Sequence, residues 1–133
     1  MQNEKEKLYN LAYIDKITKL GNYNYFLEKG NLILKNKNQN IYVLSLDIDK
    51  FKSFNNKYGH KIGSKMLYQI GKILNKNIYP KYQNNIKKES KEKSIICRLA
   101  NDMFGIIIVT DKNIQNVVDK ICKDLKKIQI NKS

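Results

Sequence analysis

Apolar residues recur at helical spacing in four stretches of the chain, which predicts helices over residues 4–13, 23–35, 62–78 and 114–128. The first of these helices places Leu8, Leu11 and Ala12 on one side. The second is expected to bury Phe26, Leu27, Ile33 and Leu34.

Three other apolar runs are typical of strands. Residues 41–48 are apolar on both faces, which predicts a strand buried between two layers. Residues 94–99 and 103–110 flank the polar pair Asn101-Asp102, as in a β-hairpin. The Lys-rich stretch 81–93 has no periodicity and is expected to be a loop. The predicted order ααβαββα indicates a layered α/β domain.

This order leaves one strand edge open. In a four-stranded βαββαβ sheet the first strand lies in the interior, between the third and the fourth. Here no fourth strand follows the last predicted helix, so residues 41–48 are expected to have one unpaired edge. Two explanations stay open: another chain covers this edge, or the chain is a shortened piece of a longer ancestor.

Length and composition fit one domain spanning residues 1–133. With 41 % apolar and 29 % charged residues, the chain can bury a core and is not a disordered tail. Cys97 and Cys122 lie in apolar runs and are expected to be core residues of a cytoplasmic protein. No apolar run approaches the roughly 20 residues that span a bilayer, and the charged N-terminus leads into no signal-peptide block. Secreted and integral-membrane classes are excluded on these grounds.

The formal net charge of +14 suggests a partner rich in phosphate. Among the 26 basic residues, however, Arg98 is the one arginine, and the lysines are scattered with no basic stripe interleaved with aromatics. Abundant Lys, Asn and Ile also match the codon usage of an AT-rich genome. We therefore expect a solvated basic surface with no specific nucleic-acid partner, and weak attraction to anions.

The chemistry-bearing residues begin with Asp47 and Asp49, at the C-terminal end of the first predicted strand. Carboxylates there are costly unless they are paired or bind a cation, and ligands collect at strand ends of α/β sheets. A divalent ion that accompanies a nucleoside triphosphate fits such a position. The alternative, that Asp49 simply caps the following helix, stays open.

A further acid, Asp102, lies at the predicted hairpin tip. Hairpin tips favour Asp and Asn for backbone reasons alone. If the hairpin lies beside the first strand, however, Asp102 lies over Asp47, and a metal ion would relieve the repulsion between the two carboxylates.

Three segments of the chain resemble the GGDEF domains of diguanylate cyclases. Residues 15–22 resemble the opening Asp-x-Leu-Thr-Gly-Leu-x-Asn signature of that family. Residues 47–63 closely follow its Asp-x-Asp-x-Phe-Lys-x-x-Asn-Asp-x-x-Gly-His-x-x-Gly motif, and residues 98–104 lie where the family has Arg-x-Gly-Gly-Asp/Glu-Glu-Phe. The resemblance covers nearly the whole chain. It implies a ferredoxin-like palm sheet flanked by helices, with residues 1–22 as a lead-in and 23–133 as a palm core that lacks the last strands and helix.

The resemblance also implies an activity. In the family two GTP-loaded subunits meet, and each 3′-hydroxyl attacks the α-phosphate of the other nucleotide, which gives cyclic di-GMP and pyrophosphate. By position, Asp47, the carbonyl of Ile48 and Asp102 would hold Mg²⁺. Lys52 would approach a phosphate and act with Asp102 in catalysis, while Asn55 would contact guanine.

Several residues depart from the family pattern. The two hairpin glycines are replaced by Ala100 and Asn101, whose Cβ atoms are expected to crowd the nucleotide and to fit a positive-φ turn poorly. Met103 replaces the second acid and cannot bind Mg²⁺. Ser64 replaces the Asp that reads the guanine edge, and Lys19 replaces a glycine of the opening signature.

Two regions outside the pocket also depart from the pattern. The inhibitory product site would fall at Lys91 to Ser94, where we expect no feedback binding of cyclic di-GMP. The phosphate-binding Lys and Arg of the family's last elements have no counterpart. The sequence thus predicts a degenerate domain with a residual Mg-GTP site and a regulatory or interaction role; the alternative is an active cyclase working as a homodimer.

Overall fold

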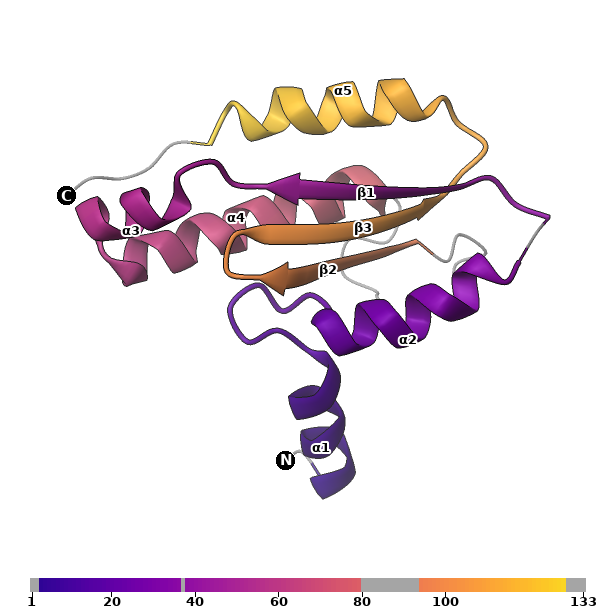
Figure 1. The fold of residues 1–133 in the computed structure, drawn as a ribbon, viewed down its shortest axis with the longest axis horizontal. Coiled ribbons are helices and arrows are strands. Elements are labelled where there is room, and N and C mark those ends of the chain that lie inside the picture. The colour runs from indigo at the N-terminus through magenta and orange to yellow at the C-terminus, as the bar shows by residue number, and fades with distance from the viewer. Residues whose placement is uncertain (1–2, 37, 80–93, 129–133) are drawn as a thin grey trace.

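The computed structural model describes residues 3–36, 38–79 and 94–128. The helices and strands in this part are α1 (Glu4–Tyr13), α2 (Tyr23–Leu34), β1 (Ile41–Asp47), α3 (Phe51–Tyr58), α4 (His60–Ile78), β2 (Ile95–Ala100), β3 (Met103–Val109) and α5 (Ile114–Leu125). Figure 1 shows them as a small sheet with helices on both sides. The predicted layered α/β architecture is confirmed.

The sheet is antiparallel with strand order β1-β3-β2 (Figure 1). β1 pairs with β3 from Ile41 opposite Val109 to Asp47 opposite Met103. Within the described residues β1 has no strand on its other side, as the element order predicts. The hairpin strand β3 therefore lies directly beside the first strand.

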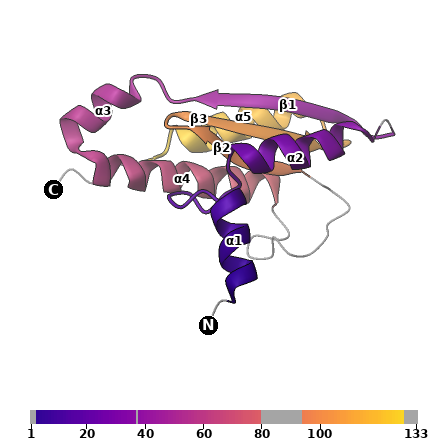
Figure 2. The same ribbon diagram turned by 60° about the horizontal axis from the view of Figure 1, so that its bottom comes forward.

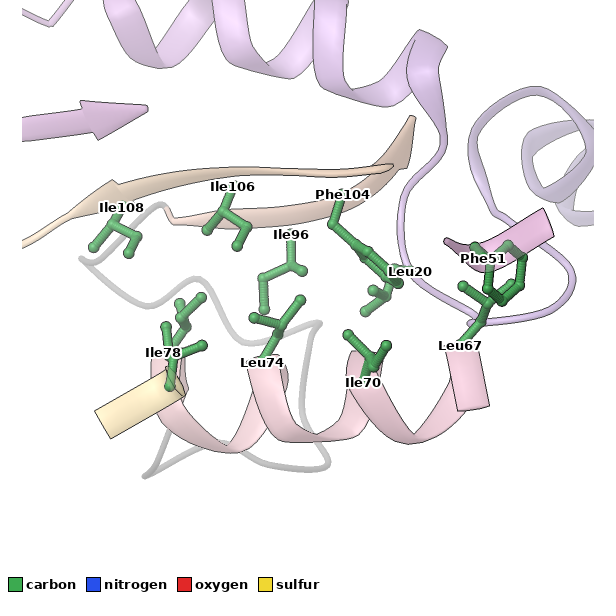
Figure 3. Close-up of a cluster of buried hydrophobic side chains, with 11 residues drawn as sticks. Leu20, Phe51, Leu67, Ile70, Leu74, Ile78, Ile96, Phe104, Ile106 and Ile108 are labelled. Carbon is green, nitrogen blue, oxygen red and sulfur yellow. The ribbon is translucent and has the colours of Figure 1, made fainter. Parts of the chain in front are cut away.

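Alternate residues of β3 point into two separate apolar clusters. Phe104, Ile106 and Ile108 pack with α4 and α5, whereas Ile107 and Val109 pack with Ile33 of α2 and with β2. In Figure 3, side chains of α4 spaced at three and four residues point toward the sheet; they are Leu67, Ile70, Leu74 and Ile78. Figure 2 shows α2 on the opposite side of the sheet from α4. Side chains on both faces of β3 are buried because helices cover it from both sides.

The prediction that β1 is buried between layers is wrong. None of its residues is fully buried, and Val43 is 56 % exposed. Since α2 packs mainly against β2, Val43 and Ser45 of β1 stay exposed on the α2 face, whereas Ile41 packs partly against the cluster beneath α2. For the same reason Leu27 and Leu34 of α2, which were expected in the core, are 43 % and 51 % exposed.

The residues between β1 and α4 form a helix that the periodicity did not predict. α3 has eight residues and buries only Phe51, so its apolar pattern is too short to detect. Gly59 separates α3 from α4 with a φ of +91°, a conformation that only glycine adopts readily. The observed order is consequently ααβααββα.

The two cysteines differ in burial. Cys97 on β2 is fully buried, and burial raises the pKa of its thiol to about 12. Cys122 is exposed, contrary to prediction, because on α5 the adjacent Ile121 turns toward the core. The predicted loop 81–93 lies outside the described residues. No helix in the described part of the chain has the length and apolar character needed to cross a membrane.

Candidate functional site

Residues from a strand end and from the hairpin turn meet at one end of the sheet. The C-terminal end of β1, the β2–β3 turn and α3 all lie there (Figure 1). The backbone N–H of Ile48 donates to the carbonyl of Asp102 at 2.8 Å, and Asp47 pairs with Met103. The prediction that Asp102 lies beside the end of the first strand is confirmed at the level of the backbone.

A pocket of about 580 Å³ opens next to this junction. Five residues that the sequence singled out line it: Lys52, Asn55, Ser64, Asn101 and Asp102. They come from α3, α4 and the hairpin turn, which are brought together by the packing of α3 on α4 and of both helices on the sheet. The pocket thus gathers most of the predicted nucleotide-binding residues.

Three predicted site residues lie outside the pocket lining. Asp47 and Ile48 stand at the neighbouring strand end, adjacent to Asp102 through the β1–β3 pairing. Ala100 lines a smaller hollow of about 280 Å³ together with Asp15 and Asn22. Ala100 therefore faces the loop between α1 and α2 (residues 14–22, the lead-in loop) rather than the larger pocket.

The sequence predicted residues with positive φ at the hairpin tip, and the structure has none there. Among the described residues positive φ occurs only at Lys19, Lys50 and Gly59, so Ala100 and Asn101 carry no such strain. A register shift between Arg98 and Ala100 supplies the extra residue that lets the strands turn without a type I′ or II′ geometry. The Ala100 and Asn101 side chains are compatible with this backbone.

Arg98 connects the hairpin to the lead-in loop. Its Nη1 donates to Asp15 Oδ1 at 3.0 Å, and its Nη2 donates to the carbonyl of Asn101 at 3.3 Å. The other carboxylate oxygen, Asp15 Oδ2, accepts from the backbone N–H and the hydroxyl of Thr18, both at 2.8 Å. This ion pair is mostly buried and fixes the hairpin turn against the loop.

Sequence reasoning assigned no site role to several lining residues, among them Ile17, Asn56, His60 and Arg98. His60 and Arg98 lie within the segments that resemble the family motifs, and Arg98 is the one arginine, so the sequence could have marked both as site residues. Ile17 carried none, because its place in the pocket depends on how the lead-in loop folds back onto α4.

Asn55 packs directly against Gly63 of α4. A Cβ at position 63 would overlap the Asn55 side chain, so the absence of a side chain at Gly63 lets the two helices approach. Asn55 Oδ1 is buried and has no hydrogen-bond partner. Because this oxygen lies against Gly63, the packing of the two helices surrounds it rather than the open pocket.

The pocket lining carries both signs of charge. Lys52 and Asp102 are exposed at the rim, whereas Arg98 is mostly buried and paired with Asp15. Buried Phe51 and Leu67 form an apolar floor. An apolar floor below cationic groups suits a ligand with a flat ring at one end and phosphates at the other.

Asp47, Asp102 and main-chain carbonyls are hard oxygen donors of the kind that Mg²⁺ prefers. No cluster of three or more His, Cys, Asp or Glu side chains occurs within the described ranges. The residues therefore do not build an all-protein cage, but two acids fit a Mg²⁺ ion that arrives with a triphosphate, since such ions take one or two carboxylates plus phosphate oxygens. When bound, Mg²⁺ would neutralise developing charge on the phosphates.

The cap interpretation of Asp49 is wrong. The N-cap position of α3 is Lys50, which has a φ of +57°, and its side chain makes no capping hydrogen bond. Asp49 is exposed and precedes that position.

Comparison with known proteins agrees with this picture. A family model described as "Diguanylate cyclase, GGDEF domain" matches residues 12–133. The biofilm architecture maintenance protein MbaA of Vibrio cholerae is 34 % identical over 77 % of the chain, and the probable diguanylate cyclase DgcT of Escherichia coli is 26 % identical over 74 %. The chain spans only 12 % and 20 % of these two relatives.

Solved structures show the same fold. The S helix-GGDEF-EAL structure of Vibrio cholerae LapD, described as bound to c-di-GMP, superposes with a TM-score of 0.75 at 23 % identity. That match covers 95 % of this chain and 29 % of the LapD chain. Pocket, strand pairing, motif spacing and these similarities lead to one assignment: the chain belongs to the GGDEF domain family of diguanylate cyclases.

Proposed function

We propose that this domain retains a Mg²⁺-dependent GTP-binding site with weak or no cyclase activity, and that it acts as a regulatory or interaction module in cyclic di-GMP signalling. The observation that carries the proposal is the pocket between α3, α4 and the hairpin. It gathers Lys52, Asn55 and Asp102 beside the strand end that bears Asp47.

In this proposal each residue has a separate task. Lys52, exposed on the rim, places a mobile positive charge where phosphates would lie. Asp47 at the end of β1 and Asp102 in the adjacent β2–β3 turn would hold Mg²⁺ together with the Ile48 carbonyl. Asn55 and Ser64 would contact the base.

The altered hairpin supports weak activity. Met103 stands opposite Asp47 in the strand register, where a thioether offers no ligand to a hard cation. Losing one charge-stabilising group at a phosphoryl-transfer site typically costs about 10²- to 10³-fold in rate. Binding depends on fewer groups than turnover, so it is expected to survive where catalysis does not.

Isothermal titration of the whole chain with GTP and Mg²⁺ tests binding. We expect saturable heat that falls when EDTA removes Mg²⁺, and that weakens by about tenfold in Asp102→Asn and in Asp47→Asn, since each loses a charged ligand. Asp111→Asn, an exposed acid beyond β3, makes the same chemical change away from the pocket. Absence of heat at millimolar GTP, or equal weakening in Asp111→Asn, would contradict the proposal.

A second candidate is an active cyclase that works as a homodimer. It is favoured by Asp102, which is retained at the acid position next to β1. Cyclic di-GMP formed from GTP by purified protein, and abolished in Asp47→Ala, would establish it. A rate that does not depend on Asp47 would point to a contaminating enzyme.

The open edge of β1 supports a proposal about partners. Within the described residues its backbone pairs only with β3. A strand from outside the described residues, such as one from a second copy of the domain, would cover this edge by strand addition.

A further inference from the structure

The lysines of α4 gather on one face of that helix. Their spacing places Lys61, Lys65, Lys72 and Lys76 in one row, on the side opposite the buried residues of the helix. All four lysines are exposed, and Tyr68 lies in the same row with 40 % of its surface exposed. These five residues are called the α4 stripe below. The expectation that the chain has no basic stripe interleaved with aromatics is therefore wrong for this helix.

Two hollows lie end to end along the stripe. One of about 520 Å³ lies over its N-terminal half, and one of about 430 Å³ lies over its C-terminal half. Gln69 lines both hollows, so together they form a groove that runs along α4. Ile17 of the lead-in loop borders the first hollow, and Lys127, just after α5, borders the second. The stripe thus lies in a shallow channel rather than on a convex surface.

The groove carries very little negative charge. α4 contains no Asp or Glu. Among the described residues Asp124 is the one acid that lines the groove, and it already accepts from Lys120 at 2.9 Å. In the same part of the chain none of the four stripe lysines forms an ion pair with an acid. Their charges are therefore available to a ligand that carries several negative charges.

The layout of the stripe favours an extended polyanion. From Lys61 to Lys76 the row is about 22 Å long, at about 1.5 Å per residue, so its charges follow one another and do not converge on a single phosphate. Among the described residues Tyr68 is the one exposed large apolar side chain of α4. A membrane surface or a protein partner would need a wider apolar patch on this face.

The position of Tyr68 favours a polyanion with unpaired bases. Lys72 Nζ lies 5.4 Å from the centre of the Tyr68 ring, so a cation and an exposed aromatic ring are side by side. Proteins that bind single-stranded nucleic acid combine a positively charged groove along the backbone with aromatic rings on which bases stack. The bases of a duplex are paired and stacked on each other, so they are not available to this ring.

We propose that the α4 stripe binds single-stranded nucleic acid without sequence specificity. The four lysines contact backbone phosphates along the groove, and Tyr68 stacks on an unpaired base. Phosphate contacts and ring stacking do not read base edges, so the binding is independent of sequence. No stripe residue lines the pocket between α3, α4 and the hairpin, so the inference does not rest on nucleotide binding there.

Fluorescence anisotropy of the whole chain with labelled oligothymidylate of about 20 nucleotides tests the proposal. We expect saturable binding at about 0.05 M salt that weakens as salt rises. A plot of the logarithm of the binding constant against the logarithm of the salt concentration should have a slope of about −3, as four phosphate contacts to a single strand require.

A pair of double variants separates the stripe from the overall charge. Lys65→Glu with Lys72→Glu should weaken binding by at least about tenfold and make the salt slope shallower by about 1. Lys7→Glu with Lys29→Glu changes the net charge equally at exposed positions of α1 and α2, and Figure 2 shows α2 on the other side of the sheet from α4. This control should weaken binding by less than about threefold, since its charges are distant and screened.

Variants of Tyr68 test the stacking. Tyr68→Ala should weaken single-strand binding by about fivefold or more with an unchanged salt slope, and should leave the binding of a duplex of the same length unaffected. Tyr68→Phe keeps the ring and should bind as the unmodified protein does. Tyr23→Ala removes a ring that is 53 % exposed on α2 and should have no effect. Circular dichroism melting shows whether each variant is folded.

Each other outcome overturns the inference. Absence of oligonucleotide binding at low salt removes it, and equal weakening by the two double variants would show that net charge alone is responsible. Equal loss of single-strand and duplex binding in Tyr68→Ala would exclude base stacking. Binding to vesicles of phosphatidylglycerol and phosphatidylcholine but not to oligonucleotide, lost in the Lys65→Glu and Lys72→Glu variant, would assign the stripe to a membrane surface. None of these results bears on the proposed GTP site, which Mg-GTP titration tests separately.

Discussion

Lys19 occupies a backbone conformation that suits glycine. Its φ of +64° lies in the left-handed region, and its backbone N–H donates to the Asp15 carbonyl at 2.8 Å, closing the turn that presents Asp15 to Arg98. A side chain in this region costs about 1 kcal/mol relative to glycine. The loop that supports the hairpin therefore carries local strain.

Lys19→Gly is expected to stabilise the protein by about 0.5–1 kcal/mol, because relief of the left-handed strain exceeds the added entropy of the unfolded chain. Urea unfolding followed by circular dichroism measures the change. Lys16→Gly is the matched control: it is exposed in the same turn but has no positive φ, so the same substitution should destabilise. Stabilisation by both variants would show that loss of a lysine charge, not backbone strain, is responsible.

Gly63 permits the contact that positions Asn55. We expect Gly63→Ala to destabilise the protein by about 1–3 kcal/mol and to weaken nucleotide binding, because the new methyl group must displace the Asn55 side chain. Chemical unfolding and titration with Mg-GTP measure the two effects.

A double-mutant cycle isolates this contact. In an Asn55→Ala background the obstacle is removed, so Gly63→Ala should cost much less there than in the unmodified protein. An equal cost in both backgrounds would mean that the alanine clashes with something other than Asn55.

At the scale of elements, one buried acid joins α5 to α4. Asp124 accepts from Lys120 Nζ at 2.9 Å and from Asn77 Nδ2 of α4 at 3.1 Å. The hydrogen bond from Lys120, followed by the one from Asn77, lowers the pKa of Asp124. Because the folded pKa lies below the unfolded value of about 3.9, this carboxylate contributes stability above about pH 4, and that stability is lost as the pH falls through the lowered folded pKa.

Asp124→Asn should therefore destabilise the protein at neutral pH, and the difference from the unmodified protein should shrink as the pH falls below about 4. Unfolding free energies measured from pH 7 to pH 3 test the slope. The exposed Asp111→Asn should show no such convergence. If the difference in unfolding free energy between Asp124→Asn and the unmodified protein stays constant with pH, the ionised carboxylate is not its cause.

The sequence predicted the elements whose patterns are long and regular, such as α4 and the β2–β3 hairpin. It did not predict α3, which is short and offers one buried residue. The burial of β1, of Leu27 and Leu34 on α2, and of Cys122 was misjudged for a different reason. An apolar residue in a correct element is buried only if another element covers its face, and local periodicity does not contain that information.

The site residues were likewise predicted only in part. The adjacency of Asp47 and Asp102 followed from strand order, and the grouping of Lys52, Asn55 and Ser64 was implied by the resemblance to the family motif. Neither the place of Ile17 in the pocket lining nor the position of Ala100 on the opposite side of the turn could be predicted from the sequence. Both depend on the Asp15–Arg98 ion pair, which joins residues 83 positions apart.

For the whole molecule, the net charge of +14 and the uncovered apolar residues act in opposite directions. Val43 lies on the free-edge strand, and Leu27, Leu32 and Leu34 are exposed on α2. Apolar surface of this kind favours association, whereas a large net charge keeps copies of the chain apart. Salt shortens the range of the repulsion to about 10 Å at 0.1 M and leaves apolar attraction in place.

Self-association should therefore increase with ionic strength. Sedimentation velocity is expected to show a larger average mass at about 0.5 M salt than at about 0.05 M, and Val43→Lys should suppress the increase by placing a charge on the exposed face of the edge strand. Ser45→Lys adds the same charge two residues along the same face without removing an apolar side chain. If both variants suppress association equally, charge on the edge decides it; if only Val43→Lys does, the apolar contact is the cause. Association that weakens as salt rises would contradict the argument, because the attraction would then have to be electrostatic.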